Sequence, residues 1–371
     1  MRARAALLKT IPGRYEIRDV ELDAPHDHEV LVRYVASGIC HSDVHFLTGE
    51  HLGVAPMCGG HEGAGVVEGV GPGVTGLKVG DHVVASFIPS CGRCRYCAAG
   101  RANLCDLGAK LQLGPQLDGT YRMHDDGEPI SQFLLISTFS PWSVVPEQSL
   151  VKVPKDVPLE TVCLLGCGVG TGLGSALNAA GVRAGHNVIV MGVGGVGINA
   201  VQGAAIAGAA TVVAVDPVPF KREMAQRFGA THAFEGIAEA TEFVHSITNG
   251  QGADSAICTM DGPTGDDVAA AFDAISKGGT VVVTGMASHH TPPGIPISLL
   301  MLAGMEKRIQ GCLFGMCSPA VDILRQIDLY RAGRLKLDEL VTRRYALEEI
   351  NDAVTDLLEG RNIRGVIVHQ H

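Results

Sequence analysis

A chain of 371 residues is longer than one simple core usually supports, so two domains are expected. Hydrophobic residues make up 46% and charged residues 18%, a balance typical of a well-buried enzyme and not of a disordered chain. The formal net charge is −10 and no run of Lys or Arg occurs, which argues against nucleic acid or an anionic membrane as a partner.

The N-terminus predicts no secretion signal, because its apolar stretch runs only from Ala5 to Leu8. No long apolar stretch free of charges and helix breakers indicates a membrane span. The eleven cysteines are odd in number, which argues against a disulfide framework. We therefore expect a cytoplasmic protein whose reduced thiols are available as metal ligands.

The N-terminal part, up to about Cys167, predicts a β-rich, barrel-like unit. Short runs of Val and Ile end at Gly, Pro or Asp, which favours strands joined by tight turns. These runs lie at residues 28–37, 63–71, 80–87 and 143–153.

From about Cys167 the pattern changes to strands that alternate with helices. Repeated β-α-β units predict a parallel sheet with helices on both faces. Strands are expected at 186–192, 211–216, 254–260 and 280–286, and helices at 195–209, 220–230 and 266–279. A last helix (320–333) and strand (364–369) are assigned to the first domain. The predicted domains are therefore 1–168 with 315–371, and 169–314.

A glycine-rich turn between an expected strand and helix matches the pattern G-x-G-x-x-G. Its residues are Gly192, Val193, Gly194, Gly195, Val196 and Gly197. Gly192 permits the tight turn, Gly194 lets a pyrophosphate approach the backbone, and Gly197 lets the helix lie close to the sheet. The helix N-terminus offers N–H groups to the phosphates. The alternative is a glycine-rich packing helix.

Asp216 ends the next expected strand, nineteen residues after Gly197. Its carboxylate should bind the adenosine-ribose hydroxyls and repel a 2′-phosphate, which favours NAD over NADP. Lys221 and Arg222 lie nearby and weaken that preference, and Lys221 is included among the candidate cofactor-binding residues.

Four cysteines at short spacing form the strongest local pattern, Cys91-x2-Cys94-x2-Cys97-x7-Cys105. Four thiolates can close a tetrahedron around zinc with no position open to water, so this site is expected to be structural. Free thiols and an iron–sulfur cluster are the alternatives.

A second, open zinc site is expected from Cys40, His61 and Cys167. A catalytic zinc needs about three protein ligands and one open position, and two thiolates with one imidazole suit zinc. Taken alone, each residue is better explained as a buried core thiol or a plain histidine, but their combination with a dinucleotide turn favours the metal. Glu62 could support the site or act as a transient fourth ligand, and Asp43 could orient the imidazole of His61.

These motifs together resemble the zinc-dependent medium-chain alcohol dehydrogenase family, over essentially the whole chain. They are GICHSD, GGHEGAGVV, CGRCRYC with the fourth cysteine, GCGVGTG, GVGGVG with Asp216, and Asn-Ile-Arg near the end. The resemblance implies an α/β protein: a GroES-like catalytic domain plus a doubly wound Rossmann domain. Stretches such as GDHVVASFIPSCGRC and NAVQGAAIAGA are similar to the N,N-dimethyl-4-nitrosoaniline-dependent, mycofactocin-associated bacterial subgroup, whose members keep NAD(H) bound during turnover.

The resemblance also implies roles for residues. Ser42 would touch the substrate oxygen, and His45 would end a proton relay through the cofactor ribose. The remaining implied positions are His41 and Arg364 at the pyrophosphate, Thr171 and Val196 beside the nicotinamide, and Phe87, Trp142, Met286 and Leu313 around the substrate. Many relatives carry Arg where His41 stands, and an imidazole should hold phosphate less strongly, which argues against tight cofactor binding.

We therefore expect an alcohol dehydrogenase with one catalytic and one structural Zn²⁺ per chain. It would transfer hydride between a primary or secondary alcohol and NAD, forming an aldehyde or ketone. An external redox acceptor would reoxidise tightly bound NAD(H). The alternatives are a conventional NAD-exchanging dehydrogenase, including one acting on a thiol–formaldehyde adduct, and a non-enzymatic zinc- and nucleotide-binding protein. The apolar segment 295–304 predicts a subunit contact in a homodimer or homotetramer.

Overall fold

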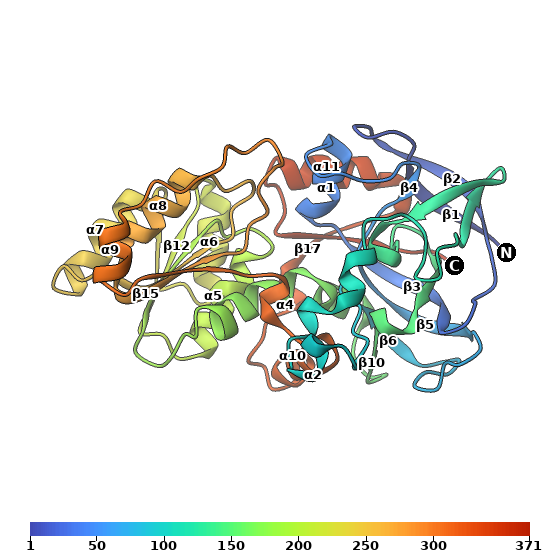
Figure 1. Ribbon diagram of the computed structural model, residues 1–371, viewed down its shortest axis with the longest axis horizontal. Helices are drawn as coiled ribbons and strands as arrows, with labels where there is room; N and C mark the ends of the chain where they lie inside the picture. Colours follow the sequence, from blue (N-terminus) through green and yellow to red (C-terminus); the bar gives the residue numbers. More distant parts are fainter. The chain divides into compact units, whose positions relative to one another are not determined.

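The computed structural model describes residues 1–371 (Figure 1). The chain divides into two compact units. Unit 1 contains residues 1–167, 318–332 and 337–371, and unit 2 contains 168–317 and 333–336. This division assigns Gly168, 315–317 and the short segment 333–336 to unit 2, whereas the sequence pattern had assigned them to the first domain.

Unit 1 begins with a small closed barrel. Its strands follow the order β1 (Arg2–Leu8), β2 (Tyr15–Leu22), β7 (Met123–Asp125), β8 (Glu128–Gln132) and β4 (Met57–Cys58). Side chains alternate along β1, as a pleated strand requires. Ala5 and Leu7 pack into one hydrophobic cluster, while Ala6 and Leu8 pack into another.

A second sheet in unit 1 brings distant parts of the chain together. Its order is β10 (Leu150–Val153), β6 (His82–Ala85), β5 (Glu62–Val70), β3 (Glu29–Gly38), β18 (Arg364–Val368) and β17 (Val341–Tyr345), with β9 (Trp142–Pro146) also pairing with β3. In Figure 1 the red C-terminal strand runs beside the blue strand β3. The register of β3 and β5 sets Gly38 opposite Glu62. This pairing positions the site described below.

Helices and 3₁₀ turns connect the strands of unit 1. The α-helices are α1 (His41–Thr48), α2 (Arg95–Ala98), α3 (Leu159–Val162), α10 (Pro319–Arg331) and α11 (Ile350–Leu358). The 3₁₀ turns are η1 (Ala102–Leu104), η2 (Asp106–Lys110), η3 (Phe133–Leu135), η4 (Glu147–Ser149), η5 (Cys163–Gly166), η8 (Asp338–Leu340) and η9 (Leu347–Glu349).

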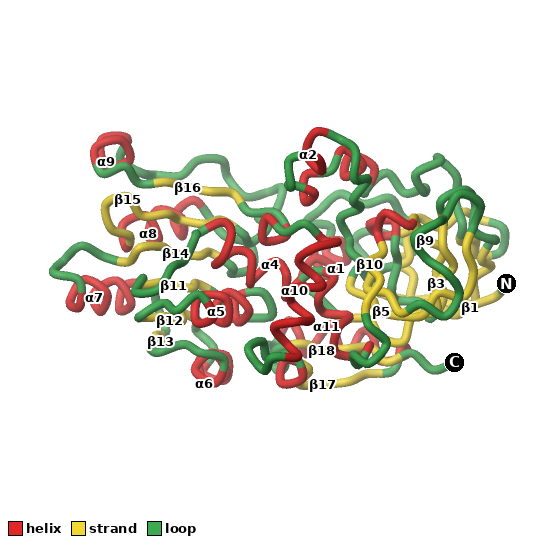
Figure 2. The backbone as a smooth tube through the Cα atoms, turned by 90° about the horizontal axis from the view of Figure 1, so that it is seen from below, coloured by secondary structure: helices red, strands yellow, loops and turns green.

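Unit 2 is built on a six-stranded parallel sheet. The order is β13 (His232–Phe234), β12 (Thr211–Val215), β11 (Asn187–Met191), β14 (Ala253–Cys258), β15 (Ile275–Val283) and β16 (Arg308–Gly311). Figure 2 shows these strands side by side among their helices. The helical segments are α4 (Gly168–Gly174), the π-helix η6 (Ser175–Ala179), α5 (Gly197–Ile206), α6 (Pro219–Arg227), α7 (Ile237–Ile247), α8 (Gly265–Ala274), α9 (Leu299–Gly304) and η7 (Phe314–Met316).

Both faces of this sheet are buried, which confirms the doubly wound arrangement. Along β11, Ile189 and Met191 join one hydrophobic cluster, while Val188 and Val190 join another. The parallel pairing of all six strands leaves the helices to cover each face.

The expected helix 266–279 is wrong at its end. Helix α8 stops at Ala274, and strand β15 begins at Ile275. Gly278 has a φ of +69°, which a helix cannot accommodate, and β14 offers a partner strand to this segment. The short strands β13, β16 and β17 and the helices α7, α9 and α11 were not anticipated.

No single helix has the length and apolar character needed to cross a membrane. Only the consecutive segments Leu159–Gly166 and Gly168–Ala179, counted together across a break, reach that length and composition.

Candidate functional site

A cluster of four potential metal ligands lies where β3 ends and β5 begins. Cys40 follows β3 and His61 precedes Glu62, the first residue of β5, so the register of the two strands brings them together. Cys167 arrives from the turn η5. One ligand atom from each of Cys40, His61, Glu62 and Cys167 lies within 4.8 Å of all the others. We call this cluster the buried centre.

The imidazole of His61 is oriented for a metal. Its Nδ1 is 3.0 Å from Oδ1 of Asp43, whose other oxygen accepts the backbone N–H of Cys40 at 3.0 Å. With a metal bound, this carboxylate would hold the proton on Nδ1 and leave the lone pair of Nε2 for the ion. That Nε2 atom is buried and has no hydrogen-bond partner. A metal ion would satisfy it.

The two thiols of the buried centre differ in pKa, so that Cys167 keeps a proton while Cys40 favours the thiolate. A hydrogen bond with Cys167 lowers the pKa of Cys40 well below its usual range, and the same interaction raises the pKa of Cys167. A thiolate is therefore favoured at Cys40 even though burial opposes it. Two sulfur ligands, one imidazole and a carboxylate fit zinc well.

Arg364 holds the carboxylate of Glu62. Both side chains are buried, and Nη2 of Arg364 pairs with Glu62 and donates to the carbonyl of Ile39 at 3.1 Å. Burial raises the pKa of Glu62, while the Arg364 guanidinium opposes that rise. The Nη1 group of Arg364 is buried without a partner. It is the donor that remains for an anionic ligand.

Helix α1 carries His41, Ser42 and His45. Ser42 is half-buried, with its Oγ 3.9 Å from the sulfur of Cys40. His41 is half-buried in the same turn. These positions set Ser42 beside the buried centre.

His45 does not lie at the surface; only 3% of it is exposed. Its Nδ1 is 2.7 Å from Oε2 of Glu50, and its ring stacks on that of His51 with centroids 4.7 Å apart. The Glu50 side chain is 43% exposed, so Glu50 links His45 to solvent. Sequence reasoning missed Glu50 and His51, although the left-handed Gly49 after α1 signals a chain reversal toward the helix.

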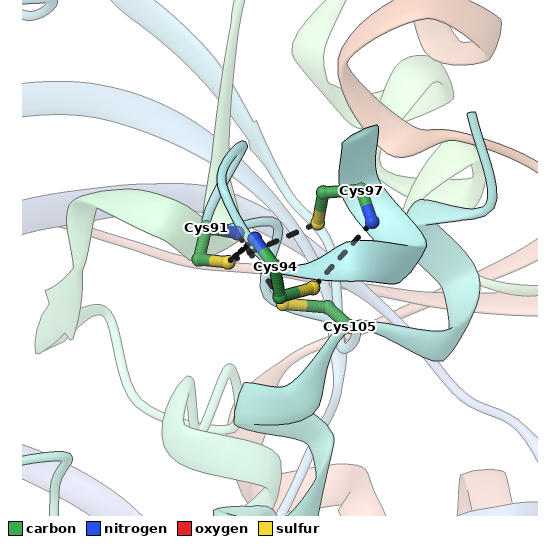
Figure 3. Close-up of side chains that lie close together, drawn as sticks. All are labelled: Cys91, Cys94, Cys97 and Cys105. Carbon is green, nitrogen blue, oxygen red and sulfur yellow. Dashed lines mark hydrogen bonds between the residues drawn. The ribbon is translucent and has the colours of Figure 1, made fainter. Parts of the chain in front are cut away.

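The four remaining metal-site cysteines form a separate group, the cysteine lobe, in which one sulfur of each lies within 4.8 Å of the others (Figure 3). Backbone N–H groups within the lobe point at sulfur. Cys94 N–H donates to Cys91 at 3.3 Å, Cys97 N–H to Cys94 at 3.4 Å, and Cys91 N–H to Cys105 at 3.4 Å.

The pKa shifts of the lobe thiols favour a bound cation. The N–H of Cys97 and further backbone donors lower the pKa of Cys94 to about 6, whereas burial raises the pKa of Cys105 to about 12. Four adjacent thiols cannot all ionise unless a positive charge lies among them. The lobe therefore fits a closed zinc site with four sulfur ligands.

The glycine-rich turn of unit 2 fits a dinucleotide phosphate. The N–H groups of Gly194, Gly195, Val196 and Gly197 make no hydrogen bond within the protein. A side chain at Gly192 would overlap the backbone of Met260, and one at Gly197 would overlap the carbonyl of Gly192. At Gly194 the nearest atom is Nζ of Lys221, 3.9 Å from a built Cβ. Lys221 thus lies beside the open part of the turn.

Asp216 is fixed at the end of β12. Its two carboxylate oxygens accept the N–H groups of Val193 and Val218, each at 2.9 Å. Arg222 donates to the carbonyls of Asp216 and Pro217 at 2.7 and 2.9 Å. One nitrogen of its guanidinium, Nη1, is thus occupied by backbone carbonyls.

Thr171 lies next to the same turn, because Gly172 packs against the carbonyl of Val196. Met286 and Leu313 are 51% and 40% exposed in unit 2.

Of the expected pocket residues in unit 1, Phe87 lies at the buried centre and Trp142 does not. The ring of Phe87 meets His61 edge-on, with centroids 5.9 Å apart. Trp142 instead packs on the cluster of the small barrel, with its ring 6.1 Å from that of His371. The pairing of β9 with β3 sets this orientation.

Phe133 is a site residue that sequence reasoning missed. Its ring meets His61 edge-on at 5.4 Å and Phe46 at 4.7 Å. A small pocket beside it is also lined by Phe46, Val54 and Leu111. The rings of Phe87 and Phe133 therefore give His61 two apolar neighbours.

Comparisons with known proteins agree with this arrangement. Residues 26–155 match the alcohol dehydrogenase GroES-like domain, and residues 195–327 match the zinc-binding dehydrogenase family. The chain is 51% identical to an NDMA-dependent alcohol dehydrogenase of Amycolatopsis methanolica, covering 100% of this chain and 99% of that protein.

Two solved structures are also similar over 100% of both chains. One is an alcohol dehydrogenase zinc-binding domain protein from Burkholderia ambifaria, with a TM-score of 0.93 and 35% identity. The other is benzyl alcohol dehydrogenase from Acinetobacter calcoaceticus, with a TM-score of 0.91 and 31% identity.

Proposed function

The chain belongs to the zinc-dependent medium-chain alcohol dehydrogenase family, and on that premise we propose that it oxidises primary or secondary alcohols to aldehydes or ketones with NAD. Unit 1 is the catalytic domain and unit 2 the NAD-binding domain in this proposal. The observation that carries it is the unpartnered Nε2 of His61 among two thiols and a carboxylate.

Two Zn²⁺ ions per chain are proposed, one in the buried centre and one in the cysteine lobe. When bound, the first would act as a Lewis acid toward the substrate oxygen, and NAD would exchange the hydride. Cys40, His61 and Cys167 would hold the zinc, with Glu62 held back by Arg364. Phe87 and Phe133 exclude water from the side of His61.

Proton transfer is assigned to helix α1. Ser42 Oγ, beside Cys40, would accept the substrate proton while the hydroxyl proton of Ser42 passes on toward His45. Glu50 keeps a proton on Nδ1 of His45, so His45 would accept the proton relayed from Ser42 at Nε2. We expect Glu50→Gln to lower turnover about tenfold while leaving NADH binding unchanged. Steady-state rates compared with those of Glu128→Gln, which removes an exposed carboxylate, would test this; equal rates in the two variants would exclude a role for Glu50.

The cofactor is proposed to stay bound during turnover and to be reoxidised by an external acceptor. The 51% identity to an NDMA-dependent relative supports this. The test is heat denaturation of freshly purified protein, with NAD and NADH counted per chain, beside turnover with and without added NAD. About one cofactor per chain, with turnover that needs an acceptor such as NDMA and ignores added NAD, is the expected result. An empty protein whose turnover saturates with free NAD would make it a conventional dehydrogenase.

The geometry disfavours a thiol–formaldehyde adduct as substrate. A charged adduct needs a free cation in the loop 108–132, which contains Lys110 and Arg122. Arg122 is fully buried and bonded to both oxygens of Glu29, at 2.6 and 2.9 Å. Only Lys110 remains. The non-enzymatic alternative would require a lost ligand, and Cys40, His61 and Cys167 are all in place.

A homo-oligomer is proposed through one face of unit 2. Leu299 and Leu300 on α9 are 75% and 80% exposed, and β16 forms an edge of the sheet nearby in sequence. Exposed leucines beside an open strand favour a subunit contact. Light scattering after gel filtration should show a dimer or tetramer that Leu300→Glu dissociates. A wild-type monomer would contradict this.

A further inference from the structure

The side chain of Asn199 completes a hydrogen bond that helix α5 leaves open. In an α-helix the carbonyl of one residue accepts the N–H four residues later. Here the N–H of Asn199 donates to Val196 at 3.0 Å, so the carbonyl of Gly195 loses its usual partner. The Nδ2 group of Asn199 donates to that carbonyl instead, at 2.9 Å.

This bond also fixes a phosphate donor. The peptide between Gly195 and Val196 is planar, so its N–H points away from its C=O. The N–H of Val196 is one of the four at the turn without a partner in the protein. Because Asn199 holds the carbonyl from within the helix, the N–H is directed outward from the helix N-terminus, where a phosphate binds.

Gln202 in turn fixes Asn199. Its Nε2 donates to Oδ1 of Asn199 at 3.0 Å and to the carbonyl of Lys336 at 3.0 Å, while its Oε1 accepts the N–H of Lys336 at 2.8 Å. Asn199 is fully buried and Gln202 is 3% exposed. The bond to Gln202 orients the Asn199 amide with its NH₂ toward Gly195. Lys336 belongs to the segment 333–336, whose neighbours along the chain lie in unit 1.

We propose that Asn199 and Gln202 are positioning residues that set how tightly the NAD pyrophosphate is held, with Gln202 anchored on the backbone of Lys336. This inference rests on the proposed function. It would also account for the firm cofactor binding proposed above in a chain where the resemblance puts His41 at the pyrophosphate. The stretch NAVQGAAIAGA begins with Asn199 and contains Gln202.

The test measures NADH binding to the full chain through nicotinamide fluorescence, both at equilibrium and as the rate of loss after dilution. Asn199→Ala should raise the dissociation constant about tenfold. Without the hydrogen bond from Asn199, the peptide between Gly195 and Val196 can turn, and the N–H of Val196 no longer points at the pyrophosphate. Gln202→Leu should raise it about threefold. Asn199→Ser should restore most of the affinity, since a serine hydroxyl also donates to the carbonyl four residues earlier.

Thr231→Val is the matched control, because Thr231 bonds both backbone groups of Val212 in the same unit. It should leave NADH binding within twofold. An equal loss in Thr231→Val, or a dissociation constant within twofold of wild type in a folded Asn199→Ala, would overturn the proposal. If Asn199→Ala does not fold, Gln202→Leu decides by the same criterion. Wild-type protein that binds no NADH would contradict the proposed function itself.

Discussion

The two sulfur clusters of unit 1 are built in opposite ways. The cysteine lobe comes from one short segment, 91–105, and its sulfurs accept hydrogen bonds from the lobe's own backbone. The buried centre collects Cys40, His61 and Cys167 from separate elements. Asp43 and Arg364 support it from α1 and from the last strand.

In the proposed function, this difference separates a structural zinc site from a catalytic one. The lobe needs only its own turns to bring its thiols together, and four sulfurs leave no position for substrate. The buried centre depends on the register of β3 and β5 and on charges brought from further away. Asp43 orients the imidazole of His61, and Arg364 holds the carboxylate of Glu62. A structural site does not require such partners for its ligands.

Loss of a ligand from the buried centre should have the largest effect. Cys40→Ser replaces a soft ligand, and we expect turnover to fall at least about a thousandfold and bound zinc to fall from about two to about one per chain. Steady-state rates and elemental analysis would measure this. Cys58→Ala, at a buried thiol outside both clusters, is the control. A variant with two zinc ions and near-normal turnover would remove Cys40 from the site.

Loss of a support should have a smaller effect. Asp43→Asn keeps the size of the side chain but removes the charge that holds the Nδ1 proton of His61. Turnover should fall about 10–100-fold, as for other partners of metal ligands. The zinc of the lobe should remain, as elemental analysis would show. Unchanged turnover would mean that the charge of Asp43 does not tune His61.

The thiols of the cysteine lobe should differ from one another in their reactivity toward an alkylating reagent as the pH changes. In metal-stripped protein the Cys94 thiol, with its pKa lowered to about 6, should be alkylated readily at pH 7, because the thiolate is the nucleophile. The rate should fall about tenfold per pH unit as the pH drops below that pKa. Cys105, with its pKa raised to about 12, should stay slow throughout. Iodoacetamide labelling with peptide mass spectrometry would compare them, and equal rates would contradict the assignment.

Loss of a lobe ligand should affect turnover least. Cys97→Ser should lower bound zinc by about one per chain and the unfolding temperature by several degrees. Turnover per folded chain should change at most a few-fold. Calorimetry and rates on the same sample would check both. A loss of turnover as large as that of Cys40→Ser would mean that the two clusters are not independent.

The features that sequence predicted well are those decided within a short segment. The short spacing of Cys91, Cys94 and Cys97 is enough to bring their sulfurs together, and the glycines of the dinucleotide turn are needed by the turn itself. The α/β fold follows from the alternation of strands and helices. The grouping of Cys40, His61 and Cys167 was also expected, because their residue types suit one metal, and the structure brings these three side chains together.

The features that sequence missed depend on partners elsewhere in the chain. Ile275 begins a strand because β14 lies beside it, although its neighbours suit a helix. Trp142 faces the small barrel because β9 pairs with β3 in one register. Glu50 reaches His45 only through the turn at Gly49. The first two of these choices are not visible in a local pattern, and for the third the only local signal is Gly49.

The segment 333–336 has a consequence for dissecting this protein into parts. A fragment containing only 168–317 would look like a complete nucleotide-binding half along the chain. It would lack Lys336, and the amide of Gln202 would lose two partners inside the core, each worth about 1–3 kcal/mol. The nucleotide-binding half therefore needs a second chain segment, 333–336, to complete the hydrogen bonds of its core. A free-standing fragment should gain stability when the four residues 333–336 are spliced back after residue 317 through a flexible linker.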